Sequence, residues 1–178
     1  MDLLTKMIQK IKDWILDEPK DKKQFFKAIW STVKLAFFVN IVVIILTWIF
    51  GLKISPRNGT GETNIFEWKF PLEIISSVGI EEFLFRWLPV AITYESGFGV
   101  IGKIIVGVLS SGIFGYLHGG ISHIFLQGAH GFISYLLFLK TSNMGKNHLK
   151  GFSATFLEHL IFNIISILIV IITGGKTI

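Results

Sequence analysis

Residues 71–91 read PLEIISSVGIEEFLFRWLPVA, an apolar run that carries Glu81 and Glu82 side by side and Arg86 one helical turn later. Placing an ionisable group at the centre of a membrane helix costs about 2.5–3.5 kcal/mol on insertion scales. A chain that keeps three such groups in one apolar run is expected to use them, either to neutralise one another or to carry out chemistry. The roles of these residues depend on which side chains from the other apolar runs can contact them.

The composition is that of an integral membrane protein. Of the 178 residues, 51% are hydrophobic and 16% charged, and the mean hydropathy is +0.63, whereas a soluble domain carries about 25% charged residues. The absence of cysteine excludes disulfides, thiolate nucleophiles and cysteine metal sites. The net charge of +5 does not indicate nucleic acid, because eight of the 17 basic residues precede residue 35, as the positive-inside rule expects of a cytoplasmic end.

Five apolar runs are close to the roughly 20 residues that a membrane helix needs; they are 28–50, 70–94, 99–118, 121–140 and 152–173. The sequence therefore predicts an all-α, polytopic transmembrane bundle in the cell membrane, with a cytoplasmic N-terminus. Residues 1–27 are expected to be an amphipathic segment in the membrane interface, residues 28–69 an extra span with a polar loop, and residues 70–178 the functional core. A helix packed on the bundle in water is the alternative for the first segment.

Several classes of membrane hydrolase are excluded by missing residues. No aspartate follows residue 21, so the chain lacks the two aspartates that intramembrane aspartyl proteases need in their spans. There is no His-Glu-x-x-His helix of the zincin type. Ser110 and Ser111 lack the Gly-x-Ser-Gly setting of rhomboid-type serine proteases and are expected to allow close helix packing.

The ionisable residues of the central run are predicted to have different roles. Glu82 and Arg86 are four residues apart on a helix, so they share a face and can form an ion pair. Such a pair costs far less in a low-dielectric site than either charge alone, and a purely structural role is expected for it. Glu81 is rotated by about 100° around the helix, so it is expected to face a different partner.

Candidate partners of Glu81 lie on two other apolar runs. His118 ends the third run, and His159 and Asn163 share one face of the fifth run at i, i+4 spacing. In such a cluster Glu81 can act as a general base toward water, and Asn163 can donate a hydrogen bond to a developing oxyanion. Imidazoles and a carboxylate also suit Zn²⁺, so His118, His159 and Glu81 are the candidate metal ligands. The alternative is a buried polar network that only fixes helix register.

Three motifs, each on its own apolar run, carry a resemblance to a known family; they are Glu81-Glu82-Phe-Leu-Phe-Arg86, Phe114-Gly-Tyr-Leu-His118 and His159-Leu-Ile-Phe-Asn163. In this order they resemble the CPBP family of CAAX prenyl endopeptidases and Abi-type, bacteriocin-processing membrane proteins. The resemblance covers roughly residues 70–174 and implies a four-helix intramembrane endopeptidase core, of a glutamate- and metal-dependent type. It implies that Glu81 activates water beside His118 and His159, and that Asn163 stabilises the oxyanion. It also implies that Glu82 and Arg86 support the site structurally or help to position substrate.

The resemblance implies that the chain cleaves a peptide bond in a membrane-embedded or lipidated peptide, in peptide processing or bacteriocin immunity. A second hypothesis is a catalytically silent immunity or scaffold protein that keeps the motif residues for structure. A third is a small transporter with Glu and His proton relays, which the absence of a visible inverted repeat disfavours. The second hypothesis predicts that Glu81→Ala and His159→Ala variants keep full function.

Other polar residues of the apolar runs are expected to have ordinary roles. His130 is expected to be hydrogen-bonded, Glu158 to pair with a basic residue at the membrane edge, and His148 to be solvated. Gly128 and Gly131 are expected to allow tight helix contact.

The proposed cluster also makes a demand on depth. His118 ends its run, Glu81 lies in mid-run, and His159 lies only about seven residues into the fifth run. The third run must therefore end inside the membrane, with the Gly119–Gly120 turn in a polar cavity, or be strongly tilted. A distance of more than about 10 Å between the Glu81 carboxylate and both imidazoles would contradict the mechanism, because direct or one-water reach is required.

Overall fold

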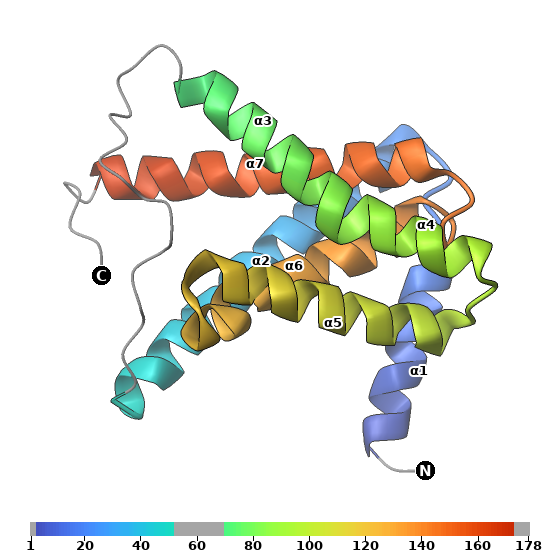
Figure 1. The fold of residues 1–178 in the computed structure, drawn as a ribbon, viewed down its shortest axis with the longest axis horizontal. Helices are drawn as coiled ribbons and strands as arrows, with labels where there is room; N and C mark the ends of the chain where they lie inside the picture. Colours follow the sequence, from blue (N-terminus) through green and yellow to red (C-terminus); the bar gives the residue numbers. More distant parts are fainter. Residues whose placement is uncertain (1–2, 52–69, 173–178) are drawn as a thin grey trace.

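The computed structural model describes residues 3–51 and 70–172, and this part of the chain is helical throughout, without strands (Figure 1). Its elements in chain order are α1 (Leu3–Leu16), α2 (Lys22–Ile49), α3 (Phe70–Glu82), the π-helical segment η1 (Phe83–Trp87), α4 (Leu88–Glu95), α5 (Val100–Gly119), α6 (Ile121–Thr141) and α7 (His148–Ile172). The prediction of an all-α fold is confirmed for the described residues.

Three of the described helices, α2, α5 and α7, are long and apolar enough to cross a membrane. Each leaves large apolar side chains on the outside of the bundle, among them Leu46, Leu109 and Leu168. The predicted run 70–94 is divided among α3, η1 and α4, and α6 carries two histidines and a glutamine, so neither is among these three. The structure agrees with the prediction of a membrane protein. Three of the described helices qualify as spans by length and composition, whereas the sequence predicted five.

Helices α5 and α6 form a hairpin in which the two backbones lie very close together. A Cβ atom on Gly115 would lie 2.5 Å from the carbonyl oxygen of His123 and 2.7 Å from the nitrogen of Gly128. Only glycine permits this approach. The turn between the helices is made by Gly120 at φ 79 and ψ −154, a region of backbone space that is essentially restricted to glycine. The predicted role of Gly128 in tight contact is confirmed.

The glutamate-bearing run changes its helix type directly after Glu82. Pro89 has no N–H, so the carbonyl of Phe85 lacks the donor that it would have in a regular α-helix. The hydroxyl of Ser110 on α5 donates to this carbonyl over 2.9 Å, and the N–H of Leu88 donates to the carbonyl of Phe83, five residues back. Single π-helical turns occur frequently at functional sites. Ser110 therefore supports η1 in addition to allowing close packing.

Helix α1 packs one face against the bundle and leaves another apolar face outside. Ile15 is buried in a cluster with Tyr135 and Phe138 of α6, and the Lys140 amine donates to the carbonyl of Trp14 over 2.6 Å. On its other side α1 exposes large apolar side chains, which include Leu3, Met7 and Leu16. The helix therefore combines docking on the bundle with an exposed apolar face.

Three connections between helices lie at one end of the bundle, on the right in Figure 1. A Cβ atom on Gly145, between α6 and α7, would lie 3.1 Å from the Tyr94 side chain at the end of α4. The Lys103 amine at the start of α5 donates to the carbonyl of Met144 over 2.5 Å. The Lys150 amine pairs with Glu18, between α1 and α2, at 2.7 Å. The α1–α2, α4–α5 and α6–α7 connections are thus joined by direct contacts.

Candidate active site

Glu81 lies between two imidazoles that come from different helices. Its Oε1 atom is 3.5 Å from Nε2 of His118 on α5, and its Oε2 atom is 3.6 Å from Nε2 of His159 on α7. These distances are far inside the limit of about 10 Å beyond which water activation by the three residues would fail. The Glu81 side chain is 18% exposed and that of His118 11%, so the cluster is not closed off on every side by the described helices.

The starting and end points of α5 and α7 differ from those of the predicted runs. Helix α7 begins at His148, four residues before the predicted run, so His159 lies near the middle of α7 rather than near its start. In Figure 1, α7 continues past the turn between α5 and α6. Helix α5 has 20 residues and α7 has 25, so α5 is shorter by roughly 7 Å at 1.5 Å per residue. The end of α5 lies beside the middle of α7, since His118 and His159 both contact Glu81.

Both imidazoles are held by their Nδ1 atoms. Nδ1 of His118 donates to the carbonyl of Phe114 one turn earlier, over 2.7 Å, and Nδ1 of His159 donates to Oε1 of Glu82 over 2.8 Å. A carbonyl and a carboxylate only accept hydrogen bonds, so Nδ1 carries the proton in each ring. In the neutral rings Nε2 then presents a lone pair, and both Nε2 atoms are directed at Glu81.

Glu82 and Arg86 form a buried layer beneath this cluster. Both side chains are fully buried, and Nη1 of Arg86 lies 3.4 Å from Oε1 of Glu82, so the predicted i, i+4 pair is present. The guanidinium lies over the ring of Phe114 at 4.4 Å. A Cβ atom on Gly131 would come within 3.3 Å of Arg86 Nη2, so this glycine leaves room for the guanidinium. The hydrogen bond from His159 to Glu82 shows that this layer also orients an imidazole of the cluster.

A second buried carboxylate, Glu158, lies on the other side of α7. Its Oε1 atom is 3.2 Å from Nε2 of His130, and the Ser134 hydroxyl donates to its Oε2 atom. Glu158 was predicted to pair with a basic residue at the membrane edge; its partner is His130, and the side chain is completely buried between α6 and α7. His130 is hydrogen-bonded, as predicted. Its ring also stacks on Phe162 and meets the His159 ring edge to face at 5.2 Å.

Two other predicted positions have different outcomes. Asn163 follows His159 by one turn of α7 and is half-buried, and among the described residues no hydrogen bond joins its amide to the cluster. His148 was expected to be solvated, but it lies beside the rings of Trp87 and Tyr94, at centroid distances of 5.5 and 6.0 Å. The prediction for His148 is wrong because its loop folds back onto α4 instead of projecting into water.

The predicted zinc ligands, His118, His159 and Glu81, have the donor types that suit this ion. Within residues 3–51 and 70–172, no group of three or more His, Asp and Glu side chains is placed so that it could hold a metal ion. Glu81 turns a different carboxylate oxygen to each imidazole, at 3.5 and 3.6 Å.

The sequence and the structure were compared with known proteins. No protein-family model, no curated protein and no solved structure matches the chain. The case for a function therefore rests on the three motifs and on the geometry of Glu81, His118 and His159.

Proposed function

We propose that the chain is an intramembrane endopeptidase of the CPBP type, which hydrolyses a peptide bond in a membrane-embedded or lipidated peptide. The observation that carries the proposal is the position of the Glu81 carboxylate, 3.5 and 3.6 Å from the Nε2 atoms of His118 and His159. These side chains come from α3, α5 and α7. Three ionisable residues from three apolar helices are costly to bury, and a shared water is the chemistry that best accounts for their convergence.

In the proposed mechanism a water molecule donates one hydrogen bond to Glu81 and one to an Nε2 lone pair. Two atoms 3.5 Å apart leave room for a water oxygen at about 2.8 Å from each. Glu81 removes a proton as the water oxygen forms a bond to the peptide carbonyl carbon, and the carbonyl electrons move onto its oxygen. The amide of Asn163 donates to this oxyanion. The C–N bond then breaks, and Glu81 returns the proton to the leaving amine.

Glu82 and Arg86 act as positioning residues in this proposal. The Glu82 carboxylate accepts a hydrogen bond from Nδ1 of His159 at 2.8 Å. This bond selects the neutral tautomer in which the other nitrogen of the ring presents its lone pair to Glu81. Arg86 balances the charge of Glu82 at 3.4 Å. This arrangement lets one carboxylate orient the imidazole and the other carboxylate act on water.

The proposal includes a five-span bundle with a cytoplasmic N-terminus, in which residues 70–178 form the four-helix catalytic core. Support comes from the contacts among the α1–α2, α4–α5 and α6–α7 connections, which include the pairing of Lys103 with Met144 and of Lys150 with Glu18. If the 70–94 run and α6 both cross the membrane, these three connections lie on the same side, and the basic residues that they contain make it the cytoplasmic side.

The test compares the purified wild-type chain with Glu81→Gln in liposomes that hold a panel of membrane-inserted, internally quenched peptides. Substrates for the panel come from peptidomics of cells with and without active protein. Glu81→Gln is expected to lower the cleavage rate by about 10²–10⁴-fold, because it removes the general base while keeping the shape of the side chain. The matched control is Glu73→Gln, an exposed position on the same helix, which should leave the rate unchanged.

The same variants discriminate a protease from a silent immunity or scaffold protein. The silent protein predicts that Glu81→Gln and His159→Ala variants, when inserted and stable, protect cells as well as the wild type does. That result, with no cleavage by the wild-type protein, would exclude the peptidase.

A further inference from the structure

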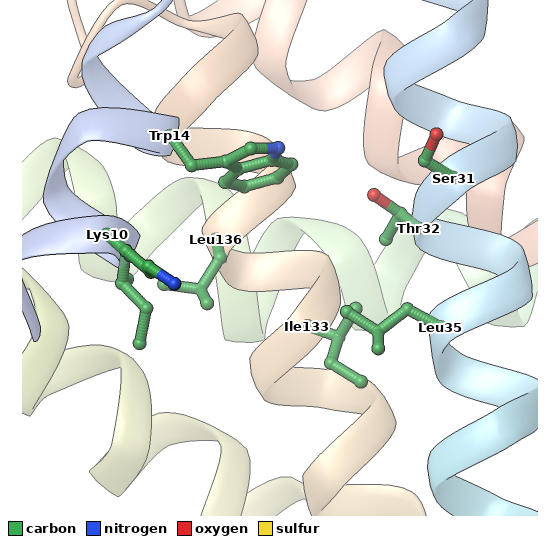
Figure 2. A pocket seen from close by; sticks show the side chains of 8 residues that line it. Lys10, Trp14, Ser31, Thr32, Leu35, Ile133 and Leu136 are labelled. Atoms are coloured by element: carbon green, nitrogen blue, oxygen red, sulfur yellow. The ribbon is translucent and has the colours of Figure 1, made fainter. Parts of the chain in front are cut away.

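A cavity of about 290 Å³ lies on the far side of α6 from the cluster, between α1, α2 and α6 (Figure 2). Figure 2 shows Lys10 and Trp14 of α1 across the cavity from Ser31, Thr32 and Leu35 of α2, with Ile133 and Leu136 of α6 beside them. The walls are mainly apolar. The Thr32 hydroxyl donates to the carbonyl of Ala28 over 2.9 Å, so it is occupied within α2.

A second cavity, of about 410 Å³, adjoins the first and has a different character. The two cavities share Trp14 and Ser31 as lining residues. The second cavity is lined by Lys20, Lys27 and Lys140, and its one carboxylate, that of Asp17, lies 3.7 Å from the Lys140 amine. With Asp17 balanced by Lys140, the amines of Lys20 and Lys27 leave an excess of positive charge.

We propose that the two cavities form a binding site for one anionic phospholipid, with its phosphate in the basic cavity and an acyl chain in the apolar one. An apolar chamber that is joined at Trp14 to a cationic chamber matches the two halves of such a molecule. Tryptophan and lysine are the residues that anchor proteins at the headgroup level. No residue of the Glu81 cluster lines either cavity, so this inference does not depend on the proposed peptidase activity.

The location of the site favours a lipid over a soluble ligand. Helix α1 carries an exposed apolar face, which includes Leu3 and Met7, and it lies against α6 beside α2, the first membrane-spanning candidate. A cavity between an interfacial helix and a spanning helix opens at the depth where headgroups meet acyl chains. A bound lipid would fill the space between α1 and the bundle and hold α1 in place.

The experiment is a native mass-spectrometric titration of the full-length protein, delipidated in detergent. Phosphatidylglycerol is added in one arm, phosphatidylcholine with the same acyl chains in a second, and glycerol phosphate without chains in a third. One phosphatidylglycerol is expected to bind per chain, at least tenfold more tightly than phosphatidylcholine, with no binding of glycerol phosphate. The Lys20→Gln/Lys27→Gln variant should lose roughly 25-fold in affinity, because each lysine near an anionic lipid contributes a factor of about five.

Two further variants separate a built site from general surface attraction. Lys6→Gln/Lys23→Gln removes the same charge from exposed positions of α1 and α2 that line neither cavity, and it should bind like the wild type. Ser31→Phe keeps every charge but places a large side chain where the two cavities meet, at an exposed position of α2. This variant should abolish tight binding. Equal binding of both lipids, binding of glycerol phosphate alone, or equal losses in the two double-lysine variants would overturn the proposal.

Discussion

At the scale of single residues, the two adjacent glutamates act on opposite sides of one imidazole. Glu82 accepts a hydrogen bond from Nδ1 of His159 at 2.8 Å, while Oε2 of Glu81 lies 3.6 Å from Nε2 of the same ring. The rotation of about 100° between neighbouring helix positions makes this division possible. A carboxylate that orients the ring and a carboxylate that faces its free nitrogen therefore come from consecutive residues.

The burial of Glu82 leads to a prediction about Arg86. In Arg86→Leu the Glu82 carboxylate stays fully buried and loses the guanidinium at 3.4 Å, and breaking such a pair costs about 3–5 kcal/mol. The double variant Glu82→Gln/Arg86→Leu removes the unpaired charge and should recover most of this loss. Unfolding in mixed micelles, followed by circular dichroism, measures both effects.

The control for this prediction is Lys146→Gln, at an exposed position between α6 and α7, which should change the unfolding free energy by less than about 0.5 kcal/mol. If Arg86→Leu is no less stable than this control, or if the double variant is no more stable than Arg86→Leu, the buried charge pair does not have the role assigned to it.

Residue spacing was sufficient to predict some of these contacts and insufficient for others. The i, i+4 rule predicted the pairing of Glu82 with Arg86, and the separation of Glu81 from it, because both depend on a single helix. The pair of His130 and Glu158 joins two helices, and no spacing within either helix gives their relative rotation. Because α7 packs against α3 on one side and α6 on another, neighbouring positions on α7 are buried in different networks.

At the scale of elements, the α5–α6 hairpin controls where His118 lies. Gly115 allows the helices to touch, and His118 is less than one turn further along α5. Any separation of the two helices would therefore move the imidazole relative to Glu81. The glycines of the third and fourth runs are part of the site's support as well as of the packing.

Gly115→Ala and Gly112→Ala test this support with the same chemical change on one helix. The added Cβ at Gly115 would lie 2.5 Å from a backbone oxygen, whereas at Gly112 it would meet nothing within 4 Å. Gly115→Ala is expected to destabilise the protein by about 1–3 kcal/mol or more. Gly112→Ala should be neutral, or stabilising by up to about 1 kcal/mol, because alanine favours the helix.

Thermal unfolding of the two purified variants measures the difference. Equal midpoints for Gly115→Ala and Gly112→Ala would mean that the hairpin can open without cost, and the close approach of α5 and α6 would then have no role in positioning His118.

The π-helical segment is the element that the sequence did not predict. The hydrophobic pattern favoured one continuous helix over 70–94, and a pattern of this kind does not reveal a single π-helical turn within a helix. Pro89 offered the available clue, because it removes the N–H that would serve the Phe85 carbonyl. The compensating donor, Ser110, lies 25 residues away on α5, so only the packed structure identifies it.

At the scale of the whole molecule, composition predicted a membrane protein more securely than it predicted the number of spans. Helices α2, α5 and α7 qualify as spans by themselves. The other two predicted spans contain the residues of the site or its neighbours, which make them shorter or more polar. Ionisable and polar side chains thus weaken the apolar signal from which spans are counted, and an experiment on membrane topology must determine their number.

A chain without cysteine allows single-cysteine variants to report the side of the membrane on which each position lies. Five spans with a cytoplasmic N-terminus place the α4–α5 connection inside the cell, whereas three spans formed by α2, α5 and α7 place it outside.

Ser96→Cys, at an exposed position of this connection, should therefore be labelled by an impermeant maleimide only after the cells are permeabilised. Lys176→Cys, which lies outside the described residues, is external in both arrangements and should be labelled in intact cells. We expect the five-span result, because the contacts of Tyr94 with Gly145 and of Lys103 with Met144 require the α4–α5 and α6–α7 connections to share one side. Labelling of Ser96→Cys in intact cells would exclude the five-span bundle, which places this position inside the cell.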